Sequence, residues 1–201
     1  MDRVTNSIIL VGAGGHACGV VDAITGSGGH VAVCVDPKPN DWLETRRVSN
    51  DDDVTPDEGA VALGVGGVTP EALKTRLALL QSFLDRNFTA NPIIHPTATV
   101  SPSAVLEAGV TVLANAVIQP FTHIESGVIV NTGAIVEHHS SVAAGAHIAP
   151  GAIVLGQCHI GSCCMIGAGA VILQKQTVAP FTLVKAVTRF PESLHKGDRK
   201  R

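Results

Sequence analysis

The sequence predicts two unlike parts: a small α/β domain of half-Rossmann type, followed by an all-β left-handed parallel β-helix. Three observations predict them. An aliphatic residue recurs at every sixth position from 94 to 184. Strand-like and helix-like stretches alternate through residues 1–90. The chain of 201 residues has 21 glycines and 11 prolines but one tryptophan and no tyrosine, which disfavours a helical bundle.

The six-residue period predicts the second part. A small residue follows each aliphatic position by four in nearly every hexad. Three hexads close one triangular coil of 18 residues, and stacked coils pair as parallel strands about 4.8 Å apart. Residues 94–184 therefore predict about five coils. The aliphatic positions are Ile94, Val100, Leu106, Val112, Ile118, Ile124, Val130, Val136, Val142, Ile148, Val154, Ile160, Ile166, Ile172, Val178 and Val184.

Residues 1–90 predict a parallel sheet covered by helices. Short apolar runs at 7–11, 31–35 and 61–65 have the composition of buried strands. One helix-like stretch ends near residue 24, and a second begins at Thr69-Pro70 and runs to about residue 83. About 90 residues are too few for the two-halved dinucleotide fold, so we expect this domain to bind a single nucleotide.

A glycine-rich turn follows the first predicted strand and opens the first helix. It contains Gly12, Gly14, Gly15 and His16. Backbone amides at a helix N-terminus bind anions such as phosphate, and Asp36 ends the second strand, where an acid would contact a ribose. We interpret these five residues as a substrate-binding site. The alternative is a turn that needs glycine only for close packing of strand and helix.

Composition argues against several classes of protein. The formal net charge is −3, and residues 94–184 carry one lysine against three glutamates, so no basic nucleic-acid-binding face is expected. No apolar run approaches the ~18 to 20 residues of a membrane span, and no signal peptide precedes the first strand, which favours a cytoplasmic protein. Five cysteines without a CxxC pair predict buried thiols rather than disulfides or a zinc finger.

Five stretches make the chain similar to the NeuD-like family of sugar acyltransferases. This family includes sialic acid O-acetyltransferases and N-acetyltransferases of nucleotide-linked 4-amino sugars of the bacillosamine type. The resemblance runs from about residue 8 to 172. It is carried by VGAGGHA at 11–17, LGVGG at 63–67, NPIIHP at 91–96, VNTGAIVEH at 130–138 and HIAPGA at 147–152.

The resemblance implies an acetyl-CoA-dependent enzyme without a metal. Residues 1–90 would bind a nucleotide sugar and 91–184 would form the acyltransferase domain. Residues 185–201 are expected to form a basic tail on their composition alone, with six Lys or Arg against two Asp or Glu. The protein would be a homotrimer with ligand sites between neighbouring solenoids. The reaction would be N-acetylation of a nucleotide-linked amino sugar, and O-acetylation of the sialic acid type is the alternative. By position in the family motifs, His138 would be the general base, His147, Gly156, Gly167 and Ala168 would bind acetyl-CoA, and Asn131 would contact the substrate.

The spacing supports part of this assignment and also contains a departure. Gly156 lies 18 residues after His138, hence one coil further, and we expect both to face one groove together with His147. The family has Asp or Glu after the base, where this chain has His139. A histidine there can fix the tautomer of the His138 ring but supplies no negative charge. We count His139 among the catalytic candidates. The segment 185–189 lacks the family's Gly and Pro but offers Lys and Arg for coenzyme phosphates.

Two other interpretations stay open. His123 and His159 lie 36 residues apart, two coils on one face, and with Cys164 they are reminiscent of the zinc site of β-helical carbonic anhydrases. A trimeric scaffold that lost catalysis through His139 is the third possibility.

Overall fold

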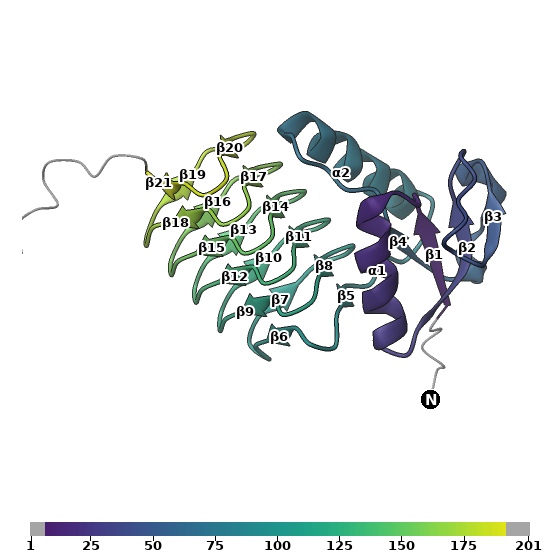
Figure 1. Ribbon diagram of the computed structural model, residues 1–201, viewed down its shortest axis with the longest axis horizontal. Coiled ribbons are helices and arrows are strands. Elements are labelled where there is room, and N and C mark those ends of the chain that lie inside the picture. The colour runs from purple at the N-terminus through teal and green to yellow at the C-terminus, as the bar shows by residue number, and fades with distance from the viewer. Residues whose placement is uncertain (1–6, 192–201) are drawn as a thin grey trace, which may run out of the picture.

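The computed structural model describes residues 7–191, and Figure 1 shows an α/β domain beside a solenoid. The α/β domain has a four-stranded parallel sheet in the order β3-β2-β1-β4. Its elements are β1 (Ser7–Val11), α1 (Gly15–Gly26), β2 (His30–Val35), β3 (Arg46–Val48), two 3-10 turns (Asp51–Asp53 and Pro56–Glu58), β4 (Ala60–Leu63) and α2 (Pro70–Asp85). Most of the basic tail expected at 185–201 lies outside the described residues.

Each face of this sheet is covered by one helix. Ile8 and Leu10 of β1 pack with α1, whereas Ile9 and Val11 pack in the cluster that contains the apolar side chains of α2. Successive side chains of a strand point to opposite faces, so a strand buried on both sides is apolar throughout. The continuous apolar run at 7–11 is explained in this way.

The predicted elements of this domain are present, with one addition. Thr69 Oγ1 accepts a hydrogen bond from the Ala72 amide at 3.2 Å, the cap that the sequence predicts for α2. The addition is β3 with the two 3-10 turns after it. Residues 46–58 are highly charged and show no apolar alternation, so β3 forms because the edge of β2 accepts it, not because of its own composition.

The solenoid consists of three parallel sheets of two-residue strands, with six, six and five strands. The helix-packed face comprises β5 (Ile93–Ile94), β8 (Thr111–Val112), β11 (Ile129–Val130), β14 (His147–Ile148), β17 (Met165–Ile166) and β20 (Leu183–Val184). The apolar face comprises β6 (Thr99–Val100), β9 (Val117–Ile118), β12 (Ile135–Val136), β15 (Ile153–Val154), β18 (Val171–Ile172) and β21 (Arg189–Phe190). The polar face comprises β7 (Val105–Leu106), β10 (His123–Ile124), β13 (Ser141–Val142), β16 (His159–Ile160) and β19 (Thr177–Val178).

The interior of the solenoid is filled as the period predicts. Strands 18 residues apart pair in register, and the aliphatic and small residues of the hexads form one buried cluster. Cys158 and Cys164 belong to it and are fully buried. The fold is thus the predicted left-handed parallel β-helix. One prediction about the cysteines is wrong: Cys18 is exposed, because it lies on α1 beside Ala17, which is the residue that faces the sheet.

The second helix lies along the corner between the polar and helix-packed faces. Gly109, Gly127 and Gly145 stack there at 18-residue spacing with φ of 68°, 69° and 71°. A Cβ added to Gly109 would lie 2.6 Å from Leu80 Cδ2, and one added to Gly145 would lie 3.1 Å from Leu77 Cβ. The glycines therefore allow α2 to contact the solenoid backbone directly, which places the α/β domain against it.

The first helix contacts the first coil of the solenoid. Ser27 Oγ donates a hydrogen bond to the Ile94 carbonyl at 2.8 Å, and His95 Nε2 lies 3.0 Å from an Asp22 carboxylate oxygen. Both helices thus hold the α/β domain on the solenoid. Neither they nor any other helix of residues 7–191 is long and apolar enough to cross a bilayer.

Candidate active site

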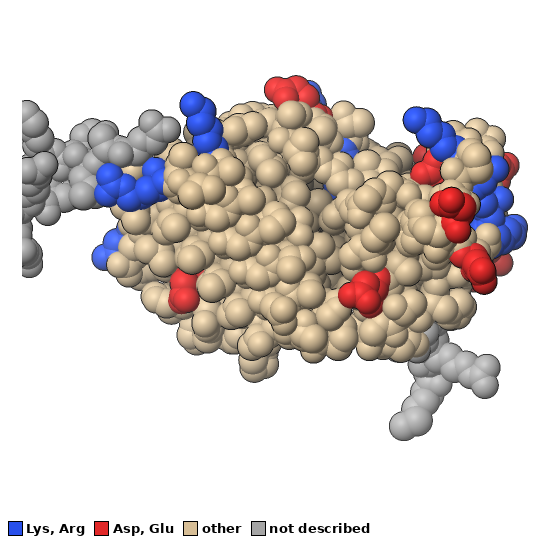
Figure 2. Space-filling model, in the orientation of Figure 1, with Lys and Arg blue, Asp and Glu red and all other residues tan. Residues whose placement is uncertain are grey.

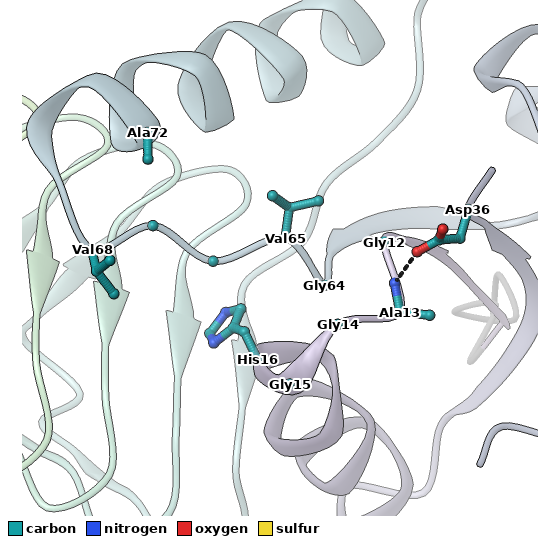
Figure 3. Close-up of a pocket in the computed structure, with 12 residues that line it drawn as sticks. Gly12, Ala13, Gly14, Gly15, His16, Asp36, Gly64, Val65, Val68 and Ala72 are labelled. Atoms are coloured by element: carbon teal, nitrogen blue, oxygen red, sulfur yellow. Dashed lines mark hydrogen bonds between the residues drawn. The ribbon is translucent and has the colours of Figure 1, made fainter. Parts of the chain in front are cut away.

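A pocket of about 500 Å³ opens where the turn after β1 faces the turn after β4 (Figure 3). Ligands of open α/β sheets bind at this carboxyl edge of the strands. We call it the glycine pocket. Residues 64–68 line one side, and the five residues predicted from the sequence line the other: Gly12, Gly14, Gly15, His16 and Asp36.

The glycines of the pocket have different roles. Gly12 has φ of +91°, and a Cβ there would lie 2.5 Å from Val65 Cγ2; a Cβ on Gly64 would lie 2.1 Å from the Gly12 carbonyl oxygen. The two turns therefore cross at a distance that only glycine permits. A Cβ added to Gly14 or Gly15 would have no atom within 4 Å, so both residues face open space. The packing alternative thus applies to Gly12, whereas Gly14 and Gly15 leave room for a ligand.

Asp36 organises the turn. Its carboxylate accepts hydrogen bonds from the amides of Ala13, at 2.7 Å, and Lys38, at 2.8 Å (Figure 3). Both oxygens therefore already have a backbone partner. Gly14 is the N-cap of α1 and offers no side-chain cap. The Ala17 amide donates to the Gly14 carbonyl at 2.9 Å, so the amides of Gly15 and His16 are the ones left for a ligand or water.

A second pocket, of about 350 Å³, lies between the α/β domain and the solenoid, and we call it the seam pocket. Gly15, His16 and residues 66–68 line both pockets, which makes them continuous. The solenoid contributes Asn131, Thr132 and His147. The structure therefore brings the predicted substrate contact Asn131 to the residues of the glycine-rich turn.

His147 bridges the two parts of the molecule. Its Nδ1 donates to the Gly67 carbonyl at 2.7 Å, which leaves Nε2 to accept from the Asn131 side-chain amide at 2.9 Å. The residue is 5% exposed. Burial lowers its pKa, the bond to Gly67 opposes this, and the charge of Arg76 adds to the lowering. His147 is therefore a neutral imidazole with a hydrogen bond at each ring nitrogen.

His16 lies in the first turn of α1, at the junction of the two pockets (Figure 3). Burial, the charge of Arg76 and the neighbouring His147 lower its pKa to about 3. Its Nε2 is buried and has no hydrogen-bond partner within residues 7–191. An unpaired buried nitrogen is unusual in proteins and is expected where a ligand or water completes the site.

The predicted base lies at the corner between the apolar and polar faces. His138 is exposed there, and a Cβ added to Gly156 would lie 2.8 Å from its Cε1 and 2.9 Å from its Nε2. The ring therefore rests on the Gly156 backbone. Its Nδ1 lies 3.1 Å from the Nδ1 of His139, whose φ is 58° and whose ring lies 4.9 Å from the ring of Phe121. The sequence-predicted pairing of His138 with Gly156 is present.

The expectation of one groove for His138 and His147 is not met within a single chain. His147 belongs to the helix-packed face, whereas His138 lies at the corner opposite it. The two residues are nine positions apart, which is half of an 18-residue coil, so they are half a turn apart around the solenoid. Residues that share a groove within one chain are related by whole coils, as His138 and Gly156 are.

Gly167 and Ala168 lie at the corner between the helix-packed and apolar faces. The Gly167 amide donates to the Val184 carbonyl at 2.9 Å, and a Cβ on Gly167 would lie 2.5 Å from the Ala186 nitrogen. The Gly167 amide is thus engaged in the hydrogen bonds between successive coils of the solenoid. Asn131 lies at the same corner, and His138 and Gly156 lie at the other border of the apolar face.

Comparisons with known proteins agree with this architecture. The family described as bacterial transferase hexapeptide (six repeats) matches residues 139–174. The acetyltransferase domain of PglB from Neisseria gonorrhoeae, solved with acetyl coenzyme A, is 30% identical with a TM-score of 0.84; the match covers 92% of this chain and 90% of that chain. PerB from Caulobacter crescentus, solved with CoA and GDP-perosamine, is 29% identical with a TM-score of 0.83, covering 94% and 90%.

This chain belongs to the hexapeptide-repeat sugar acyltransferases. A search of curated protein sequences found no match.

The structure argues against a zinc site formed by His123, His159 and Cys164. Cys164 is fully buried inside the solenoid, and its Sγ donates to the Ala179 carbonyl at 3.0 Å. His123 pairs with Glu107 at 2.8 Å, and His159 bonds Ser141. No group of three or more potential metal ligands occurs within residues 7–191.

Sequence reasoning missed one residue of the site. Arg76 of α2 is 1% exposed, and its Nε donates to the Val65 carbonyl at 2.8 Å while Nη1 bonds the Gly127 carbonyl of the solenoid. A signal was present, because Arg76 falls within the apolar stripe formed by Leu73, Leu77 and Leu80. A charged residue inside such a stripe indicates a special role.

Proposed function

We propose that the protein is an acetyl-CoA-dependent N-acetyltransferase acting on a nucleotide-linked amino sugar. The observation that carries the proposal is the close approach of the His138 ring to Gly156, where an added Cβ would lie 2.9 Å from Nε2. It occurs in a fold that matches, over nearly the whole chain, an acetyltransferase bound to acetyl coenzyme A and one bound to CoA and GDP-perosamine.

The arrangement provides the two groups that acetyl transfer needs. The amine nitrogen of the acceptor attacks the thioester carbonyl, a C–N bond forms and the C–S bond breaks. His138 Nε2 takes the proton that the nitrogen loses, and the departing thiolate of coenzyme A regains a proton. A positioned base contributes ~10²–10⁴-fold, and an amide that donates to the developing oxyanion ~10²–10³-fold. The Gly156 amide has no acceptor within residues 7–191 and is assigned this second role.

His139 would fix the tautomer of the base. The two Nδ1 atoms are 3.1 Å apart, so one of them must carry the shared hydrogen. When His138 is the donor, its Nε2 has the free lone pair and faces Gly156. Contact with Phe121 holds the His139 ring in place. In this way a neutral side chain performs the orienting task of the acid in the related enzymes, though without its charge.

The acceptor would bind in the glycine pocket with its nucleotide and reach into the seam pocket with its sugar. The open space at Gly14 and Gly15 and the first-turn amides of α1 suit a phosphate group. His16 Nε2 and the side chain of Asn131 offer polar contacts in the seam pocket.

A homotrimer would complete the site. On the apolar face the outward side chains of adjacent coils form a ladder of partly exposed aliphatic residues: Val117, Ile135, Ile153 and Val171. Figure 2 shows few charged side chains on the solenoid, whereas they gather on the α/β domain. Packing of three such faces around a threefold axis buries the ladders. It also brings the His138 border of one copy to the Asn131 border of the next, which unites base and acceptor pocket.

The coenzyme would lie in the groove between two solenoids. Gly156 and the exposed Ala168 remain the proposed contacts of the acetyl and pantetheine groups. His147, also expected from the resemblance to bind acetyl-CoA, is buried with a hydrogen bond at each ring nitrogen, so its influence on the coenzyme would be indirect. A pocket of about 200 Å³ at the last coil is lined by Lys185, Thr188 and Arg189, which suits the coenzyme phosphates. Use of acetyl-CoA and a nucleotide sugar would place the enzyme in the cytoplasm.

The test is acetyl transfer with purified protein. The protein is incubated with acetyl-CoA and a panel of UDP- and GDP-linked 4-amino sugars, each paired with the analogue that carries a hydroxyl in place of the amine, and release of the coenzyme thiol is followed. Acetylation of an amino sugar, with the hydroxyl analogue inert, is expected. Acetylation of the hydroxyl analogue alone would make the protein an O-acetyltransferase. No transfer with any acceptor, from protein that binds acetyl-CoA, would contradict the proposal.

A further inference from the structure

The two pockets lack a positive side chain. Among the residues that line them in the part of the chain the structure describes, Asp36 is the one formally charged residue, and none is Lys or Arg. A nucleoside diphosphate brings further negative charge to this place. The first-turn amides of α1 provide a partial positive charge of roughly half a unit, which falls short of the charge of a diphosphate.

A cation lies directly behind the pocket wall. Arg76 Nε donates to the carbonyl of Val65, and Val65 lines the glycine pocket. No carboxylate within residues 7–191 forms an ion pair with Arg76, and its Nη2 is buried without an acceptor. An unpaired buried guanidinium is costly to a fold, so its presence beneath this wall requires an explanation.

The field of Arg76 reaches the pocket. His16, which lines both pockets, is one of the groups whose pKa the Arg76 charge lowers, after burial itself. Arg76 stays protonated at neutral pH although burial lowers its pKa to about 10. Behind the wall of the glycine pocket there is therefore a positive charge at all pH values near neutrality. Its buried surroundings screen that charge poorly.

We propose that Arg76 is the counter-charge of the acceptor's diphosphate and acts through the pocket wall formed by Val65, without contacting the ligand. The inference rests on the proposed function in that the acceptor is nucleotide-linked. Arg76 is thus a positioning residue: it holds the turn after β4 by its hydrogen bonds and attracts the diphosphate by its charge. At an effective dielectric constant of about 20, one charge about 10 Å from a phosphate changes its affinity by about tenfold.

Two variants separate the charge of Arg76 from its hydrogen bonds. Arg76→Gln removes the charge and keeps a donor for the Val65 carbonyl, whereas Arg76→Lys keeps both a charge and a donor. Calorimetry measures the affinity of each protein for UDP and uridine, and for GDP and guanosine. We expect the wild type to prefer the diphosphate, Arg76→Lys to keep most of this preference, and Arg76→Gln to lose about tenfold of it while nucleoside affinity changes by less than about twofold.

Several results would overturn the inference. A purely structural role predicts that Arg76→Gln weakens diphosphate and nucleoside equally. If the wild type binds UDP no more tightly than uridine, and GDP no more tightly than guanosine, there is no diphosphate preference for the Arg76 charge to produce. Should Arg76→Gln not fold, the wild type alone decides: a buried charge is poorly screened, so the preference for UDP over uridine should persist in about 0.5 M salt, and its disappearance contradicts the proposal. Charge-dependent binding without any acetyl transfer would refute the proposed function and leave this inference standing.

Discussion

Among single residues, the site depends on backbone geometry as much as on side chains. Gly156 allows the imidazole of His138 to rest on the main chain, because any Cβ would overlap the ring. The bonds of His147 to Gly67 and Asn131 give it the opposite character: a buried histidine with both nitrogens occupied. One histidine is therefore available for proton transfer and the other holds structure.

This contrast predicts different effects of two alanine variants. His138→Ala should reduce kcat by ~10²-fold or more with little change in acetyl-CoA affinity, because a general base acts in the transition state. His147→Ala should mainly weaken ligand binding and lower Tm, because it removes a bond between the two parts of the chain. Steady-state kinetics and acetyl-CoA titration measure both. Full activity of His138→Ala would exclude it as the base.

His139→Asp tests the departure from the related enzymes. Aspartate tolerates the positive φ of this position and can accept from His138 Nδ1. It also stabilises the protonated imidazole, so activity should be equal or higher and the acid limb of the pH–rate profile should move to higher pH. Loss of activity in His139→Asp together with tolerance of His138→Ala would identify His139 itself as the base.

The buried histidines predict an acid-sensitive fold. The pKa of His16 is about 3 in the folded protein and near 6.5 when unfolded, and the pKa of His147 is lowered in the same direction. The unfolded chain therefore binds more protons than the folded one below about pH 6.5, and stability falls as pH falls from there towards 3. Denaturation by urea at several pH values should give a smaller loss for His16→Gln than for wild type. The matched control is the same change of His to Gln at the exposed His159, which lies outside both pockets.

Among the elements, the contact of α2 with the glycine corner determines the position of the α/β domain. Three glycines at 18-residue spacing let Leu77 and Leu80 approach the solenoid backbone closely. Both pockets depend on this contact, since the turn that joins β4 to α2 lines each of them.

Two alanine substitutions test the packing of α2. Gly109 and Gly133 have nearly equal φ, 68° and 65°, but Gly109 faces Leu80 whereas Gly133 has no atom within 4 Å of an added Cβ. Each variant should lose about 1–2 kcal/mol from the left-handed backbone. Gly109→Ala should lose a further ~1–3 kcal/mol from overpacking. Equal losses in chemical denaturation would show that α2 does not depend on this corner.

At the scale of the whole molecule, one chain keeps the proposed base and the proposed acceptor pocket apart. The seam pocket lies at the helix-packed face and the His138–Gly156 pair at the far corner, with the apolar face between their borders. Burial of that face against other copies would both stabilise the solenoid and complete the site.

Subunit mixing tests this arrangement. His138→Ala lacks the base, and Gly14→Trp should block the glycine pocket without disturbing the fold, because the position faces open space. Co-refolding the two inactive variants in equal amounts should restore about a quarter of wild-type activity if each site takes its base from one subunit and its pocket from the next. A site within one chain predicts no recovery.

A matched pair of surface changes tests the interface itself. Ile153→Glu on the apolar face should dissociate the trimer and abolish activity, because it would bury an unpaired charge. Thr177→Glu, exposed on the polar face, should do neither. Sedimentation measures the oligomeric state, and a trimer that survives Ile153→Glu would move the interface elsewhere.

Features that repeat or are local could be predicted from the amino acids alone. The six-residue period predicts the solenoid because each coil contacts only its neighbours, and the pairing of His138 with Gly156 follows from the same arithmetic. The strand–turn–helix at 7–26 and the cap at Thr69 are likewise local. Strand β3 was not predictable, since its pairing comes from β2 and not from its own residues.

The way in which the two parts meet is visible only in three dimensions. The seam pocket, the bond of His147 to Gly67 and the burial of Arg76 join residues far apart in the chain, and no period or motif encodes those distances. The expectation of one groove for His138 and His147 failed for a different reason: their spacing of nine residues is half a coil, so the repeat itself places them on opposite sides of one solenoid. A repeat specifies neighbours along its own axis, while the packing of a second domain on one face depends on side-chain shape at the contact.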